Sequence, residues 1–277
     1  MKKTVVVFIV LIFTQTIKAD NWISSFEDGQ KLALATNKLM LVDFWASWCG
    51  PCRDMDSESW DRDEVKLLMK NFVPVKINID LNKELALKYE VKGIPFIFIM
   101  DGNGEVIYKQ MSYKTKSEVI TMLNKYRLDM SYLAPFLTSF YKKKSFSSSF
   151  RLGLKYNDFS LFLDEDIRRD VLLLSNQYFD ISKKLLKKSN LNNKKDFLQQ
   201  IALYKVKERL ILNKFNKAKK LLSKFKEEDI ANINRSFYYR LNYISSKKAE
   251  DSSNENLWLK KLSETDMIKV EVFFKYI

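Results

Sequence analysis

The most constraining feature of the sequence is an apolar run that leads directly into its two cysteines, Cys49 and Cys52. Leu39–Trp45 reads LMLVDFW, and only Asp43 interrupts its apolar character, so it predicts a strand buried on both faces. Pro51 stands between the cysteines and suits the first turn of a helix, where its missing N–H is not needed. The stretch therefore predicts a strand that ends where a helix begins, with both cysteines at the junction.

The residue types present limit what these cysteines can do. The sequence contains 2 Cys and 0 His. Histidine-dependent triads, cysteine–histidine proteases and histidine-ligated zinc or haem are therefore excluded. Two thiols alone cannot complete a four-ligand zinc site. We expect no metal and no cofactor beyond a redox-active Cys49–Cys52 disulfide, because a three-residue spacing on a helix brings two thiols within bonding reach.

Charge and turn residues divide the chain into two parts. Residues 131–277 carry 30 Lys and Arg but 17 Asp and Glu, which places +13 of the net charge of +14 in the second half. Five of the 6 glycines and three of the 4 prolines fall in the first half. We therefore predict an α/β domain at 20–128 and a basic, all-helical domain at 129–277.

The N-terminus predicts a signal peptide over residues 1–19. Lys2 and Lys3 precede an apolar run from Thr4 to Phe13, and a cleavage site follows Ala19. The run is shorter than the roughly 20 residues that a membrane span needs. We expect the folded part to be exported, periplasmic or secreted; the alternative is membrane anchoring by an uncleaved segment.

The first domain alternates helix and strand patterns. The spacing of apolar residues and the positions of turn residues predict a first helix at 24–37, the strand at 39–45 and a helix with a break at 49–70. A strand at 72–79 and a short helix at 83–89 follow. A hairpin then joins strands at 96–100 and 105–109 around a turn at 101–104, and a helix at 116–126 closes the domain.

This order and the WCGPC sequence at 48–52 resemble the thioredoxin superfamily over about residues 22–127. Val42–Cys52 is similar to its active-site stretch, Lys76–Asp80 to its next core strand, and Gly93–Pro95 to its cis-proline loop. The resemblance implies the thioredoxin fold, a central mixed sheet flanked by helices. The longer segment Ser57–Asn71 is similar to the exported thioredoxin-like domain of the DsbD membrane reductase family.

The two cysteines suit thiol–disulfide exchange. The reaction needs a thiolate that attacks and a second thiol that resolves the mixed disulfide. A helix N-terminus stabilises a thiolate, as in thioredoxins themselves. We therefore expect an oxidoreductase with Cys49 as the exposed nucleophile and Cys52 as the buried resolving thiol. The alternative is a structural disulfide.

Asp43 and Lys76 are the candidate groups for proton transfer. Asp43 lies in an apolar strand, where burial disfavours its ionised form. The resemblance implies that Asp43 exchanges a proton with Cys52 and that Lys76 modulates this carboxylate. The alternative is a structural polar pair.

Substrate-binding residues follow from the resemblance. A cis bond between Ile94 and Pro95 would present the Ile94 backbone to an extended substrate peptide. Trp48 and the pair Gly50–Pro51 would border the same surface. Ser112 occupies a position often held by glycine, which predicts an altered substrate groove.

The pair Gly50–Pro51 also bears on the direction of electron flow. It lacks the histidine of strongly oxidising relatives, so it resembles the reducing end of the superfamily. We expect an enzyme that reduces or exchanges disulfides of envelope proteins, with a membrane electron donor. The alternative is an interaction or chaperone-like protein that uses the domain as a peptide-binding platform.

Helical periodicity dominates the second half. We expect helices at 167–179, 183–188, 197–212, 217–225 and 232–244, with a looser segment at 145–150. Phe179–Lys188 recurs as Phe215–Lys224, which resembles a degenerate tetratricopeptide repeat; the alternative is a non-repeating bundle. The basic surface predicts contact with an acidic protein or an anionic surface, and no nucleic acid is expected.

Overall fold

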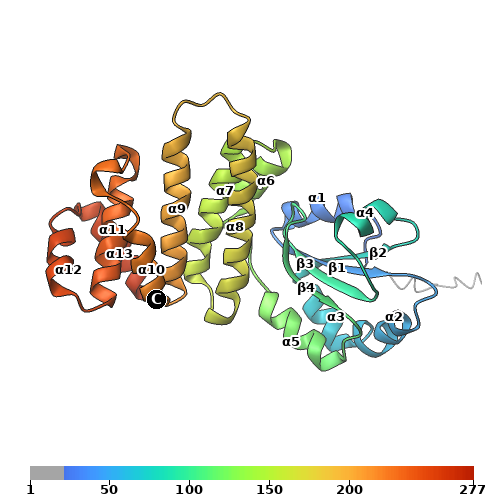
Figure 1. Cartoon of the computed structure of the whole chain (residues 1–277). Helices are drawn as coiled ribbons and strands as arrows, with labels where there is room; N and C mark the ends of the chain where they lie inside the picture. Colours follow the sequence, from blue (N-terminus) through green and yellow to red (C-terminus); the bar gives the residue numbers. More distant parts are fainter. Residues whose placement is uncertain (1–21) are drawn as a thin grey trace, which may run out of the picture.

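The computed structural model describes residues 22–277, and the predicted signal peptide at 1–19 lies outside them. Figure 1 shows a sheet with helices on both faces and, beside it, a row of helices formed by the second half of the chain. The predicted class, an α/β domain followed by an all-helical region, is confirmed. Within residues 22–277, no helix is both long enough and apolar enough for a membrane crossing.

The sheet has four strands in the order β2-β1-β3-β4. β1 (Leu39–Trp45) runs parallel to β2 (Phe72–Asn78) and antiparallel to β3 (Phe96–Met100). β4 (Val106–Met111) pairs antiparallel with β3 at the edge. Because helices cover both faces, β1 and β3 are buried almost throughout, which explains their unbroken apolar sequences.

Helices cover the two faces of the sheet (Figure 1). On one side lie α1 (Phe26–Thr36) and α4 (Lys83–Lys88). On the other lie α2 (Gly50–Met55), the π-helical segment η1 (Asp56–Trp60), α3 (Asp63–Met69) and α5 (Lys116–Tyr126). The break predicted within 49–70 is therefore confirmed, and η1 and the turn after it separate α2 from α3.

Alternate residues of β1 belong to different cores, as expected for a strand. Met40 and Val42 join the core beneath α1, whereas Leu39 and Leu41 join the core beneath α2, α3 and α5. Asp43 follows Leu41 by two positions and therefore points to the side of the sheet that α2 covers.

The second half is helical throughout. Its elements are α6 (Ala134–Lys142), α7 (Phe146–Phe159), η2 (Ser160–Phe162), α8 (Glu165–Lys187), α9 (Lys194–Ile211), α10 (Phe215–Leu222), η3 (Glu227–Asp229), α11 (Asn232–Lys248), α12 (Ser252–Leu259) and α13 (Glu264–Tyr276).

The expectation of a looser segment at 145–150 is wrong. Ser145 caps α7, since its side chain accepts a hydrogen bond from the backbone N–H three residues later. Phe146 and Phe150 pack against Phe197 of α9. Their ring centroids lie 4.8 and 5.3 Å, respectively, from the ring centroid of Phe197. The serines thus start a helix that two aromatic side chains anchor.

The predicted break between Phe179 and Lys183 is also wrong, because α8 continues through it. Ser182 is buried in this stretch and donates a hydrogen bond to the Phe179 carbonyl at 2.8 Å, within the helix. Phe179 therefore lies inside α8, whereas Phe215 is the first residue of α10. The two copies of the repeated sequence do not occupy equivalent positions, and the tetratricopeptide assignment stays a prediction.

A buried carboxylate joins the helical region to the sheet. Asp101, in the turn between β3 and β4, accepts hydrogen bonds from the hydroxyl groups of Tyr156 at 2.8 Å and Tyr178 at 2.5 Å. Its other oxygen accepts the backbone N–H groups of Asn103 and Glu105. Burial raises the pKa of Asp101, and these hydrogen bonds oppose that rise. The turn is thus held by side chains of α7 and α8.

This junction lies at the end of the sheet away from the cysteines. In the antiparallel pairing of β1 with β3, Met40 is opposite Met100 and Phe44 is opposite Phe96. Asp101 therefore adjoins the start of β1, while Cys49 follows its end. Figure 1 shows α2 on the side of the sheet that faces away from the helical region. One buried apolar cluster is continuous across the predicted boundary at residue 128.

Replacing Tyr178 by phenylalanine is expected to lower the free energy of unfolding by about 2 kcal/mol, because the buried Asp101 loses one of four hydrogen bonds. Urea denaturation followed by circular dichroism measures the change. Tyr141→Phe is the matched control, since the Tyr141 hydroxyl makes no hydrogen bond with described residues. Equal stability of the two variants would contradict a structural role for this junction.

Candidate functional site

Cys49 and Cys52 form a disulfide at the junction of strand and helix. Cys49 is the N-cap of α2, with an extended backbone, and its Sγ accepts the backbone N–H of Cys52 at 3.2 Å. Pro51 lies in the first helical turn, as predicted. Local sequence thus places both sulfur atoms at the end of β1, with a backbone donor aimed at the sulfur of Cys49.

Both cysteines are buried in the disulfide form. Cys49 is 4% exposed and Cys52 is 2% exposed, so the expectation of an exposed Cys49 is wrong for this state. The pair packs with Ala46 and against the side chains of Ile79 and Ile94. In this disulfide form the sulfur of Cys49 therefore offers little accessible surface to a substrate.

The loop before β3 lies against the cysteine pair. The peptide bond between Ile94 and Pro95 is cis, as the resemblance implies. Ile94 is partly buried against the cysteines, and the carbonyl of Pro95 accepts the N–H of Ser112 at 3.0 Å. The structure thus brings the predicted substrate-binding loop to the cysteine pair.

Trp48 forms the exposed border of the site. Its side chain is 64% exposed, and its indole N–H donates a hydrogen bond to Asp80 at 3.0 Å. The neighbouring Leu81 is 81% exposed. Asp80 ends the segment that resembles a core strand, but its role in holding Trp48 was not predicted. Trp48 thus offers an exposed apolar side chain next to Cys49 in the chain.

Asp43 is buried beneath α2 and is 2% exposed. Burial raises its pKa from 3.8 to about 7, and the Asp56 carboxylate adds to this effect, while the Lys76 ammonium opposes it. Its Oδ1 atom and the indole N–H of Trp60 have no hydrogen-bond partner among residues 22–277. Asp43 is therefore a carboxyl group that can gain or lose a proton near neutral pH.

Lys76 lies opposite Asp43 in the register of β1 and β2. Its ammonium is bonded to the Asp56 carboxylate and lies 5.0 Å from the ring centroid of Trp45 and 5.6 Å from that of Trp22. These contacts hold a positive charge beside the buried acid.

Asp56 is a functional candidate that the sequence analysis missed. It follows Cys52 by four residues, a spacing that predicts both side chains on one face of a continuous helix; in the structure Asp56 is the first residue of η1, directly after α2. That spacing was the available signal. Its partnership with Lys76 depends on how η1 lies against β2, which no local pattern shows.

Ser112 has a left-handed backbone, with φ of 92°, next to the cis-proline loop. Such a conformation is strained for any residue other than glycine. We expect Ser112→Gly to raise the free energy of unfolding by about 1 kcal/mol, since the relief of strain exceeds the entropic cost of glycine. Chemical denaturation measures this effect. Ser117→Gly, within α5, is the control and should lower stability; a destabilised Ser112→Gly protein would contradict the prediction.

No group of three or more His, Cys, Asp or Glu side chains able to hold a metal ion occurs in the part of the chain that is described.

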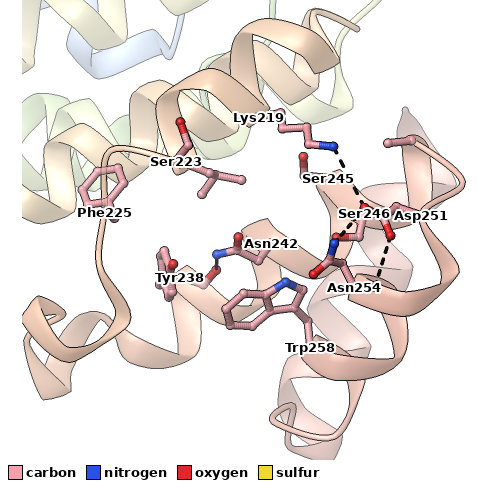
Figure 2. Close-up of a pocket in the computed structure, with 12 residues that line it drawn as sticks. Lys219, Ser223, Phe225, Tyr238, Asn242, Ser245, Ser246, Asp251, Asn254 and Trp258 are labelled. Carbon is pink, nitrogen blue, oxygen red and sulfur yellow. Dashed lines mark hydrogen bonds and ion pairs between the residues drawn. The ribbon is translucent and has the colours of Figure 1, made fainter.

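A separate pocket of about 230 Å³ lies between α10, α11 and α12 (Figure 2). Aromatic side chains form part of its wall, among them Tyr238 and Trp258. Its polar groups bind one another: Asn254 donates to Asp251 at 2.8 Å, and Lys219 lies 4.0 Å from the same carboxylate. No cysteine lines it, so it takes no part in disulfide chemistry.

Comparisons with known proteins agree with this geometry. The family model described as Thioredoxin matches residues 22–125. Thioredoxin of Bacillus subtilis is 34% identical over 95 residues, which is 32% of this chain and 82% of that protein. Thioredoxin of Buchnera aphidicola is 33% identical over 108 residues, 38% of this chain and 96% of that protein. The fold and the cysteine pair define a thioredoxin-type thiol–disulfide oxidoreductase, and the chain belongs to the thioredoxin family.

Solved structures similar to this chain include the C-terminal domain of DsbD from Neisseria meningitidis in its oxidised form. It is 19% identical, with a TM-score of 0.34, and the match covers 38% of this chain and 98% of that domain. The family model ends at residue 125, before the helical region begins.

Proposed function

We propose that this protein is an exported enzyme that reduces or exchanges disulfides of envelope proteins, with Cys49 as nucleophile and Cys52 as resolving thiol. The observation that carries the chemistry is the Cys49–Cys52 disulfide at the N-terminus of α2, above the buried Asp43. Support for export comes from the sequence of residues 1–19, with its two lysines, apolar run and cleavage site.

The reductive reaction proceeds in two exchanges. The Cys49 thiolate attacks one sulfur of the substrate disulfide, forms a mixed disulfide and releases the other substrate sulfur as a thiolate. The Cys52 thiolate then attacks Cys49, releases the second substrate sulfur and closes the Cys49–Cys52 disulfide. Two electrons pass to the substrate, and its two sulfurs take up two protons. A dithiol donor, which we propose to be a membrane protein, returns the enzyme to its reduced form.

Asp43 takes up the proton of Cys52 during the second exchange. Its pKa of about 7 matches this task, because a base works best when its pKa is near the ambient pH. Lys76 limits the rise in that pKa, and Asp56 holds the Lys76 ammonium in place.

The substrate binds as an extended segment beside the cis-proline loop. The backbone of Ile94 pairs with it as an added strand, and Trp48 contacts its side chains. Gly50 has no heavy atom beyond its chain neighbours within 4 Å of a built Cβ, so a small side chain would fit at this position. Gly50 and Pro51 together border the substrate-binding surface beside the cysteines.

The helical region docks the partner protein while the cysteines react. It meets the sheet at Asp101, at the end of the sheet away from the cysteines, so it does not cover them. The charge of +13 over residues 131–277 favours an acidic protein over other partners, with an anionic surface as the alternative. An array of helical hairpins, resembling tetratricopeptide repeats, would provide such a surface.

A second candidate function is a chaperone-like platform that binds peptides without exchange. The exposed, apolar side chains of Trp48, which precedes Cys49, and of Leu81 favour it. Disulfide exchange requires the sulfur of Cys49, whereas peptide binding alone does not.

Catalytic reduction of insulin by the full chain, with dithiothreitol as donor, tests the chemistry. Cell fractionation and N-terminal sequencing after expression in a Gram-negative host test export. We expect turnover, an envelope location and a mature chain that begins at Asp20. Peptide binding without turnover would favour the platform, and a cytosolic chain that begins at Met1 would contradict export.

A further inference from the structure

We propose that a groove in the helical region binds an acidic, amphipathic segment of a partner protein. The proposal deepens the docking role suggested above and is independent of the thiol chemistry. The groove has a volume of about 460 Å³, within the range of small binding sites. Its walls come from α7, α9, α11 and α13, which are alternate helices of the chain, together with η2.

Positive charge dominates the groove. Of the side chains that line it, only that of Asp158 is a carboxylate. Four are cationic: Lys155, Lys207, Arg240 and Lys269. Asp158 lies 2.6 Å from Lys207 and 3.8 Å from Lys155, so one carboxylate serves two ammonium groups. Lys269 is exposed and forms no ion pair with any residue of 22–277. A segment with carboxylates would balance this surplus.

The cations lie against aromatic rings. Lys207 is 5.4 Å from the ring centroid of Tyr204, and the Arg240 guanidinium is 5.5 Å from that of Phe237. These contacts hold the charges close to an aromatic floor. At the rim, Phe162 and Ile268 remain 50% and 60% exposed. The groove thus offers positive charge and apolar surface side by side, which fits a segment that carries acidic and apolar residues together.

The position of the charges favours a polypeptide over a membrane. The side chains of Lys207 and Arg240 are only 11% and 15% exposed, because they lie inside the groove. Arg240 is also paired with Asp266 at 2.7 Å. A flat anionic surface reaches protruding lysines but not recessed ones, whereas a narrow chain segment enters a groove.

Fluorescence anisotropy with the full chain tests the proposal. The probe is a fluorescein-labelled peptide of alternating aspartate and leucine, compared with one of alternating asparagine and leucine. We expect only the acidic peptide to bind. Lys269→Glu should weaken that binding about tenfold by reversing a charge at the site, and Ile268→Ser about fivefold through lost apolar contact. Both replaced side chains are exposed, so the fold should tolerate the changes.

Lys205→Glu is the matched control. Lys205 is exposed on α9 but does not line the groove, so its reversal changes the net charge equally and should alter affinity less than about twofold. Equal weakening by Lys205→Glu and Lys269→Glu would overturn the proposal in favour of non-specific attraction. Absence of peptide binding, or binding only to phosphatidylglycerol vesicles, would also overturn it. Insulin reduction by the unaltered chain reports separately on the proposed enzymatic function.

Discussion

Replacing Cys49 by serine is expected to abolish catalytic reduction of insulin. A serine hydroxyl neither forms a stable thiolate-like nucleophile at neutral pH nor makes a disulfide. The rate should fall to that of dithiothreitol alone. This is a loss on the order of 1,000-fold or more, as is typical when an enzyme loses its covalent nucleophile. The turbidity of precipitating insulin chains measures this rate.

Cys52→Ser is the matched variant, because it keeps the attacking sulfur and removes the resolving one. It should form a mixed disulfide with substrate through Cys49 that persists on a non-reducing gel. The reverse outcome, in which Cys52 is trapped and Cys49 is dispensable, would contradict the assigned roles. If the Cys49→Ser variant still binds peptide and the unaltered protein shows no turnover, these results would support the platform function instead.

Replacing Asp43 by asparagine is expected to stabilise the oxidised protein at alkaline pH. The pKa of Asp43 is raised from 3.8 to about 7 on folding, so the folded state binds its proton more tightly than the unfolded state. The free energy of unfolding of the unaltered protein therefore falls as the pH rises from about 4 through 7, by about 4 kcal/mol in total. Asparagine cannot ionise, so the variant escapes this loss.

Urea denaturation at pH 4.5 and pH 8 measures the effect. The variant should gain up to about 4 kcal/mol over the unaltered protein at pH 8 and much less at pH 4.5. Asp54→Asn, on the exposed side of α2, is the control and should show no such dependence on pH. A variant that is less stable at pH 8 would show that the Asp43 carboxylate is stabilised, rather than penalised, by its surroundings.

The first domain was largely predictable because its signals are local. Leu39–Trp45 and Lys116–Tyr126 match β1 and α5 at both ends. An unbroken apolar run marks the strand, and apolar residues at helical spacing mark the helix. The cis bond before Pro95 and the burial of Asp43 followed from the resemblance and from the apolar strand around it.

The missed features depend on contacts between distant segments. Asp56 acquires its role by meeting Lys76, 20 residues away. Asp101 is held by Tyr178, 77 residues further along the chain. Serine-rich composition suggested a loop at 145–150, but Phe197 from another helix anchors that segment as a helix. Composition and spacing describe one segment at a time and cannot report such partners.

The redox equilibrium of the Cys49–Cys52 pair tests the central claim most directly. The full chain is equilibrated in graded glutathione buffers, and the fraction of disulfide is measured after alkylation of free thiols. We predict reversible exchange with a midpoint nearer to the roughly −270 mV of thioredoxins than to the roughly −180 mV of disulfide isomerases. A midpoint near the second value would contradict a reductase and favour an oxidase or isomerase. A pair that never exchanges with glutathione would contradict the enzymatic function itself.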